Sequence, residues 1–239
     1  PGIRTLIKIM NQIGEVVVVA PDSSQSGKGH AITIDNVLTC NPITIDDGPQ
    51  LEYACSGTPA DCVKMALNEI LNRKPDLCVS GINHGANSSI NVIYSGTMGA
   101  AIEAGIEGVP AIGVSLLDFK WDADFRYSEE YVKKISLQAL QNGIPEGVVL
   151  NVNIPNLKTE EIKGVKICRQ ANGRWKENFD KRKSPFGKKY YWLAGDFIIN
   201  DKGQDTDLYA LEKGYVSVVP VQFDMTAHHM IEKLNLWEL

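Results

Sequence analysis

The apolar and polar positions along the chain alternate in a way that predicts alternating helices and strands. Apolar residues recur at helical spacing over 3–13, with Gly14 as a stop, and the Val-rich run 15–20 is typical of a strand buried on both faces. The same rhythm predicts helices over 58–72, 97–107, 127–142 and 226–235 and strands over 31–34, 37–40, 43–45, 52–55, 76–80, 111–116, 148–153, 164–169, 189–194 and 214–221. This order indicates an α/β fold with a doubly wound, largely parallel sheet.

Two polar loops follow strands at the end of the sheet where α/β proteins bind their ligands. Loop 21–30 follows the first predicted strand, and loop 81–97 follows strand 76–80 and is rich in Asn, Ser and Gly. Such loops surround an anion or a metal ion with amide and hydroxyl groups. Because the carboxyl ends of parallel strands meet at one edge, we expect the two loops to face one another.

The start of the predicted helix 97–107 has the composition of a phosphate-binding turn. Ser95-Gly96-Thr97 directly precedes an apolar, Ala-rich stretch, so backbone N–H groups and hydroxyls would converge at a helix N-terminus. The alternative is a loop whose Asn and Gly residues only form turns. The density of polar residues over 80–101 favours the binding site.

Composition narrows the class of protein and of partner. The chain has 239 residues, 44% of them hydrophobic and 22% charged, as in an ordinary soluble globular protein. No stretch approaches the roughly 18 apolar residues of a membrane span, and a net charge of -5 argues against a nucleic-acid polymer as partner. We therefore expect a small anionic ligand, and neither a nucleic acid nor a membrane.

The five cysteines bear on the cellular compartment. They lie at positions 40, 55, 62, 78 and 168, without a C-x-x-C pair, and several sit within apolar runs. This pattern is typical of reduced core thiols, so the sequence predicts a cytoplasmic protein without disulfides.

The last third of the chain differs in character. Ten of the 27 residues from 163 to 189 are Lys or Arg, with Trp175, Phe179 and Phe186 between them. A nucleic-acid surface is one interpretation, but aromatic residues with Arg serve equally well at subunit interfaces, and an isolated hairpin is marginally stable. We expect a core over 1–160 and, over 161–239, a hairpin arm, a returning strand and a C-terminal segment that pack on another copy of the protein.

Five motifs, in order along nearly the whole chain, resemble the survival protein E (SurE) family. They are Ala20-Pro21-Asp22 with Gln25 to His30, Gly57-Thr58-Pro59-Ala60-Asp61-Cys62-Val63, Ser80-Gly81-Ile82-Asn83 with Gly85 and Asn87, Tyr94-Ser95-Gly96-Thr97 with Gly99-Ala100, and Arg169-Gln170 with Ser184-Pro185-Phe186-Gly187 and Tyr190-Tyr191-Trp192. The resemblance implies a metal-dependent 5'-nucleotidase acting on nucleoside monophosphates, with 3'-nucleotides left open. It also implies a Rossmann-like domain, a protruding hairpin and an exchanged C-terminal segment that build a homodimer or homotetramer.

The resemblance further implies the ligands of one divalent metal ion per subunit. In the family two adjacent Asp, a Ser and an Asn hold the metal, and the last two correspond to Ser26 and Asn83. These all-oxygen ligands suit Mg, Mn or Ca. Asn87, Ser95, Gly96 and Thr97 are then expected to bind the phosphate.

The family's Asp pair is absent from this chain. It belongs to an Asn-Asp-Asp-Gly-Ile motif after a first strand, ahead of the helix that begins here at Pro1, so we expect the sheet to lack a central strand. Asp46-Asp47 is no substitute, because it lies between strand-like runs in an ordinary turn sequence.

Three functional alternatives follow from these residues. The leading one is the phosphatase, with water as the attacking group, since nothing places a base beside Ser26, Ser80 or Ser95. Without the Asp pair the protein would be a nucleotide- or anion-binding protein that does not turn over its ligand. A dinucleotide-dependent oxidoreductase is disfavoured, because no G-x-G-x-x-G follows a strand. His30 and His84 are either acid or phosphate partners or structural loop residues.

Overall fold

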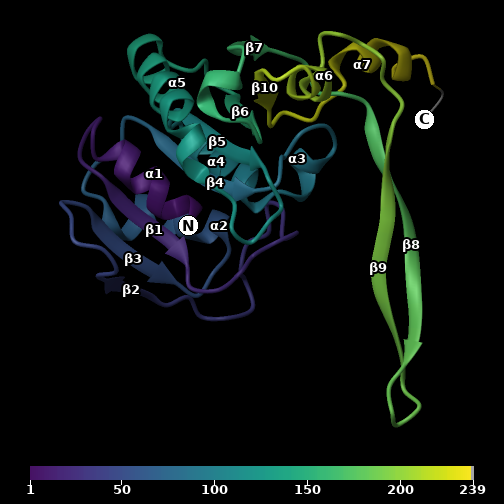
Figure 1. Cartoon of the computed structure of the whole chain (residues 1–239), viewed down its shortest axis with the longest axis horizontal. Coiled ribbons are helices and arrows are strands. Elements are labelled where there is room, and N and C mark those ends of the chain that lie inside the picture. The colour runs from purple at the N-terminus through teal and green to yellow at the C-terminus, as the bar shows by residue number, and fades with distance from the viewer. Residues whose placement is uncertain (238–239) are drawn as a thin grey trace.

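The body of the molecule is built on a five-stranded sheet in the computed structural model, which describes residues 1–237 (Figure 1). The strand order is β4-β5-β6-β10-β7. These strands are β4 (Cys78–His84), β5 (Ala111–Leu117), β6 (Val148–Pro155), β7 (Val165–Ile167) and β10 (Val216–Gln222). Strands β4, β5 and β6 are parallel, and β10 runs antiparallel to β6 and parallel to β7. The prediction of a largely parallel α/β sheet is confirmed.

Helices cover both faces of this sheet. Helices α1 (Gly2–Met10) and α5 (Glu129–Asn142) pack on one face, while α4 (Gly96–Ile106) packs on the other and contacts α2 (Pro59–Met65). Successive side chains of β5 point to opposite faces of the sheet and so reach the helices on both sides. Its Ile112 and Val114 join the core with α1 and α5, and its Ala111 joins the core with α4.

A second sheet of three strands stands apart from the first. Its order is β1-β3-β2, with β1 (Val17–Pro21) parallel to β3 (Leu51–Cys55) and β2 (Cys40–Ile43) antiparallel to β3. Strands β1 and β4 are the edges of their sheets and line a common cavity of about 730 Å³.

Several predicted elements differ in extent. No strand forms over 31–39, because this segment bonds to the start of α2: the Thr33 hydroxyl donates to Asp61 Oδ2 at 2.7 Å. The predicted helix 58–72 ends in a π-helical turn, η1 (Ala66–Ile70), and β4 runs four residues beyond its predicted end at 80. The remaining short helices are α3 (Asn91–Tyr94), η2 (Phe125–Ser128), η3 (Thr159–Glu161) and α6 (Asp207–Glu212), which the sequence analysis missed.

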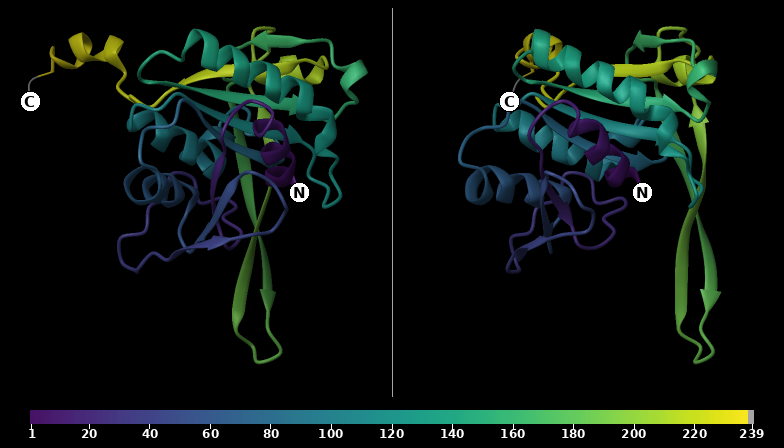
Figure 2. Two further views of the ribbon diagram at one scale, coloured as in Figure 1. Left: turned by 90° about the vertical axis from the view of Figure 1, so that its left-hand side faces the viewer. Right: turned by 60° about the vertical axis from the view of Figure 1, so that its left-hand side comes forward.

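A long antiparallel hairpin projects from the body, as the family resemblance implied (Figures 1 and 2). The strand predicted over 164–169 is not part of it, because that segment joins the main sheet as β7 beside β10. Its strands β8 (Gly173–Lys183) and β9 (Lys189–Ile199) are each 11 residues long, and almost all their side chains are exposed. At its base the Trp175 indole Nε1 donates to Asn91 Oδ1 at 2.8 Å. Helix α7 (His228–Leu234) extends from the body after β10 (Figure 2).

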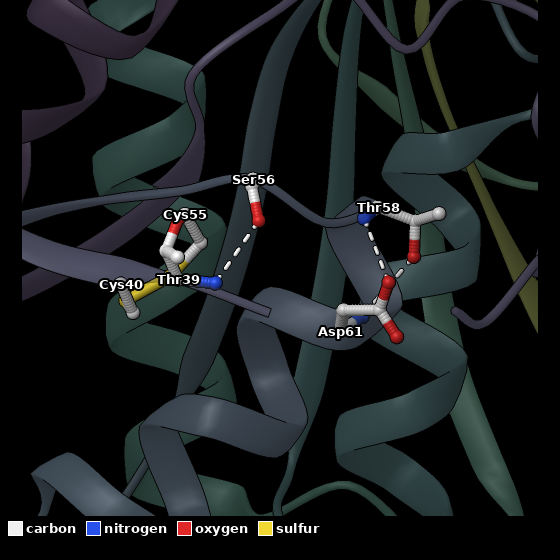
Figure 3. Close-up of a disulfide and its surroundings, with 6 residues drawn as sticks. All are labelled: Thr39, Cys40, Cys55, Ser56, Thr58 and Asp61. Carbon is white, nitrogen blue, oxygen red and sulfur yellow. Dashed lines mark hydrogen bonds between the residues drawn. A yellow bond between two sulfur atoms is a disulfide. The ribbon is translucent and has the colours of Figure 1, made fainter. Parts of the chain in front are cut away.

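One expectation about the cysteines is wrong. Cys40 of β2 and Cys55 of β3 form a disulfide with Cα atoms 4.1 Å apart (Figure 3). The pair is 15 residues apart in sequence, and the antiparallel register of the two strands brings it together. Cys62, Cys78 and Cys168 are free, and burial raises the pKa of Cys62 to about 12 and that of Cys78 to about 11.

Candidate functional site

The two polar loops meet at the N-terminus of α4. The Gly29 amide donates to the Tyr94 carbonyl at 3.1 Å. The Gly29 carbonyl in turn lies so close to Gly99 that a Cβ on Gly99 would stand 2.5 Å from its oxygen. Gly96 approaches the Gln25 carbonyl of the same loop and the Pro59 ring at the start of α2. The expectation that loops 21–30 and 81–97 face one another is confirmed.

The first turn of α4 begins as its sequence predicts. Ser95 is the N-cap, and its Oγ accepts a hydrogen bond from the Met98 amide at 3.0 Å. Ser95 is therefore used to shape the turn. Thr97 is half-buried and lines the cavity between β1 and β4, together with Asn83. A helix N-terminus thus opens toward this cavity.

The two predicted metal ligands are oxygen-bearing side chains in different settings. Asn83 lies in β4, where the register with β5 shifts, and its Nδ2 donates to the carbonyls of His84 at 2.9 Å and Gly85 at 2.8 Å. Both amide hydrogens are thereby occupied, which fixes the amide and leaves Oδ1 on its opposite side. Ser26 is exposed on its loop, with its Oγ 3.4 Å from Ser24 Oγ.

Asn87 takes part in a buried polar network. The backbone N–H of Asn87 donates to Asn153 Oδ1 at 2.6 Å, and its side-chain Nδ2 donates to Ser115 Oγ at 2.7 Å. Its carbonyl accepts from Asn151 Nδ2 at 2.8 Å. These contacts anchor loop 85–95 on β5 and β6. Sequence analysis missed the anchor, although the alternation of Asn151 and Asn153 with apolar residues in β6 is a signal of it.

The residues at hand fit part of a coordination shell for a hard divalent cation. Ser26 and Asn83 offer neutral oxygens, which Mg and Ca accept, but such ions take about six or more ligands. Within residues 1–237 no three His, Cys, Asp or Glu side chains are grouped to hold a metal. Asp46 pairs with Arg4 Nη1 at 3.3 Å in the connection between β2 and β3, in agreement with its turn role.

The two loop histidines have different partners. His30 Nε2 lies 2.7 Å from Glu103 Oε2 on α4. The His84 ring packs edge to face on Phe125, with centroids 4.8 Å apart. The contact with Phe125 favours the structural alternative for His84.

The fold and these loops define an α/β protein that presents a helix N-terminus and neutral side-chain oxygens at the carboxyl ends of its strands, which is typical of phosphate-binding proteins. A family model described as survival protein SurE matches residues 1–177. The chain belongs to this family, and the resemblance drawn from its motifs is confirmed.

Relatives match over the whole chain. A protein named 5'-nucleotidase SurE from Flavobacterium psychrophilum is 66% identical over 239 residues, which is 100% of this chain and 93% of the relative. Another of the same name from Christiangramia forsetii is 65% identical over 240 residues, covering 100% and 92%. The crystal structure of the SurE protein from Aquifex aeolicus has 39% identity and a TM-score of 0.84, covering 98% of this chain and 93% of that one.

Proposed function

We propose that this protein is a metal-dependent 5'-nucleotidase that hydrolyses nucleoside monophosphates to nucleoside and phosphate. The observation that carries the proposal is the match to curated 5'-nucleotidases at 65 and 66% identity over the whole chain. The alternative, a binding protein without turnover, is disfavoured by the same relatives. Whether 3'-nucleotides are a second substrate is left to the assay.

Ser26 and Asn83 are the proposed ligands of one divalent ion per subunit, Mg, Mn or Ca. Their support is the family motif and the fixed amide of Asn83, whose Nδ2 is held by two carbonyls. When bound, such an ion offsets the charge of the phosphate and lowers the pKa of water. The remaining ligands would be the family's Asp pair, which this sequence does not contain.

The first turn of α4 is the proposed phosphate site. The first N–H groups of a helix lack intrahelical acceptors, so those of Gly96 and Thr97, together with the Thr97 hydroxyl, are the proposed donors to the phosphate oxygens. Ser95 shapes the turn as its cap, and Asn87 holds the preceding loop on the sheet. Water is the proposed attacking group, because the Ser95 hydroxyl caps the helix and that of Ser26, among the described residues, hydrogen-bonds with Ser24 and with no base.

Self-association is the proposed role of the C-terminal part, residues 161–239, with residues 1–160 as the catalytic part. The hairpin exposes large apolar side chains, among them Trp192 at 62%, Leu193 at 67% and Phe186 at 98%. Exposed apolar groups of this kind are typical of interfaces. A homodimer or homotetramer, with the C-terminal segment exchanged between copies, would cover them.

We propose a cytoplasmic location, which the free thiols of Cys62, Cys78 and Cys168 support. The Cys40–Cys55 disulfide does not support it. No helix within residues 1–237 has the length and apolar character needed to cross a membrane. Fractionation of cells with an antibody to the protein decides between compartments.

The function is tested on the protein expressed from its complete gene. Phosphate release from a series of nucleoside 5'-monophosphates should stop on chelation with EDTA and return with Mg or Mn, and the same assay with 3'-monophosphates decides whether they are a second substrate. Asn83→Ala should weaken metal binding, whereas Thr97→Ala should mainly raise KM. The matched control is Asp47→Ala, a turn residue outside the site. Hydrolysis that survives chelation would refute the metal-dependent mechanism.

A further inference from the structure

A buried carboxylate joins the three segments that surround the proposed site. Glu103 lies on α4, and its side chain is only 4% exposed. Its Oε2 lies 2.7 Å from Nε2 of His30 in the polar loop 21–30, and its Oε1 lies 2.5 Å from Nζ of Lys64 on α2. Neither the metal site nor the phosphate turn uses this carboxylate.

The burial of Glu103 makes its two partners necessary. A buried carboxylate without hydrogen bonds is strongly destabilising, and here each oxygen has one donor. The hydrogen bond to Glu103 in turn raises the pKa of Lys64. Both partners are more exposed, His30 at 32% and Lys64 at 40%, so each reaches inward from the surface to meet a fixed acceptor.

The position of Glu103 on α4 directs it toward the loop. Gly99 and Glu103 are four residues apart on one face of the helix. Gly99 abuts the Gly29 carbonyl, and the next loop residue, His30, meets Glu103 one turn further along. Backbone packing and a side-chain bond therefore act together at the point where the loop returns to the body.

The rest of the loop lacks such an attachment. Among the described residues, the side chains of 22–28 hydrogen-bond only one another: Ser24 Oγ lies 3.4 Å from Ser26 Oγ, and Gln25 Nε2 donates to Ser23 Oγ at 3.2 Å. Ser26 is four residues ahead of His30. The His30 bond is thus the side-chain attachment nearest to the proposed metal ligand.

We infer that His30 and Glu103 are positioning residues that set the location of Ser26 beside the first turn of α4. Lys64 donates a hydrogen bond to the same carboxylate but lies on α2, outside the loop. The expected effect on metal binding rests on the proposed metal site, whereas the attachment of the loop is a property of the metal-free protein.

Amide hydrogen exchange on the metal-free protein tests the attachment. In His30→Ala the amides of Lys28 and Gly29, which donate to the carbonyls of Gln25 and Tyr94, should exchange roughly tenfold faster, since a hydrogen bond to a charged group is lost. Lys64→Met is the matched control, because it removes the other partner of Glu103 and should leave the exchange of these two amides within about twofold of the parent. His30→Gln retains a donor and should restore protection. Equal acceleration in His30→Ala and Lys64→Met, or none in either, overturns the inference.

Titration with Mn²⁺, followed by the EPR signal of the free ion, tests the consequence for Ser26. The Kd should rise about tenfold in His30→Ala, remain near the parent value in Lys64→Met and recover in His30→Gln. Faster exchange in His30→Ala without a change in Kd refutes the link to Ser26. The titration uses protein expressed from the complete gene; if that parent protein binds no Mn²⁺, the proposed metal site is wrong, while the exchange data still decide whether His30 holds the loop.

Discussion

Asp207 offers the sharpest test of how the site loop is held. It is fully buried at the start of α6. Its Oδ2 accepts from the Ser89 amide at 2.7 Å, and its Oδ1 accepts from the Ala171 amide at 3.0 Å and from the Leu208 amide at 2.8 Å. Ser89 has a φ of 55° in the left-handed region, which costs conformational energy. One carboxylate therefore joins loop 85–95, the base of the hairpin and α6.

The magnitude follows from what Asp207→Ala leaves behind. The substitution deprives two buried amides, those of Ser89 and Ala171, of their acceptor, at about 1 to 3 kcal/mol each. The Leu208 amide is only partly buried, so water replaces that bond at little cost. We expect a loss of roughly 2 to 6 kcal/mol in the free energy of unfolding. That is a large share of the roughly 5 to 15 kcal/mol typical of a folded protein.

Equilibrium unfolding in urea, followed by circular dichroism, measures this loss. Asp205→Ala is the matched control, because Asp205 is an exposed carboxylate that pairs with Arg169 at 2.8 Å, and it should change the unfolding free energy little. Asp207→Asn should fall between, since its amide keeps one oxygen as an acceptor and turns an NH₂ toward the other donors. An unfolding free energy for Asp207→Ala within about 1 kcal/mol of the parent would refute the reasoning.

Three further outcomes are expected. Burial opposes the charged form of Asp61, but hydrogen bonds from Thr33 and Thr58 outweigh burial and lower the pKa of this carboxyl. The stability that the Asp61 carboxylate contributes is therefore present above about pH 4 and is lost as the pH falls below that value. Thr33→Val should flatten this part of an acid-unfolding curve. Cys62, whose pKa is raised to about 12, should resist alkylation at pH 8 in native protein and react after unfolding, as mass spectrometry would show. Joining Lys176 to Asp196, which are partners across the hairpin, through a short Gly turn should lower the particle mass in light scattering, and an unchanged mass would contradict the proposed role of the hairpin.

Local signals predicted the parts of the fold that depend on neighbouring residues. Thr58 and Pro59 mark the start of α2, where a capping box with Asp61 confirms them, and Ser95 marks the start of α4. The disulfide depends instead on the register of two strands, and no spacing of cysteines reveals it. Helix α6 was missed because its six residues are too few to show a helical period.

The candidate site residues also differ in how far local sequence signals predict them. Thr97 and the meeting of the loops followed from sheet topology and helix-start chemistry, whereas Ser26 and Asn83 came only from the family motifs. The alternation of Asn151 and Asn153 with apolar residues signals a buried polar network in β6, but their pairing with Asn87 could not be predicted, because the partners are 64 and 66 residues away. Pairing over such separations is fixed by the register of β5 and β6, which a single sequence does not display.

The turn proposed to bind phosphate and the loop proposed to bind metal are attached to the body by different contacts. The turn at 95–97 is held by its own cap, and the preceding loop is held by Asn87 on the sheet and by Asp207 through Ser89. The loop with Ser26 is attached through its backbone at Gly29 and through the side chain of His30. Because the two sets of contacts share no side chain, changes in the first should alter KM for the phosphate, and changes in the second should alter the metal requirement. The proposed phosphate turn is therefore held on the sheet by its own contacts, and the affinity of the proposed metal site should depend on how firmly a separate loop is held beside that turn.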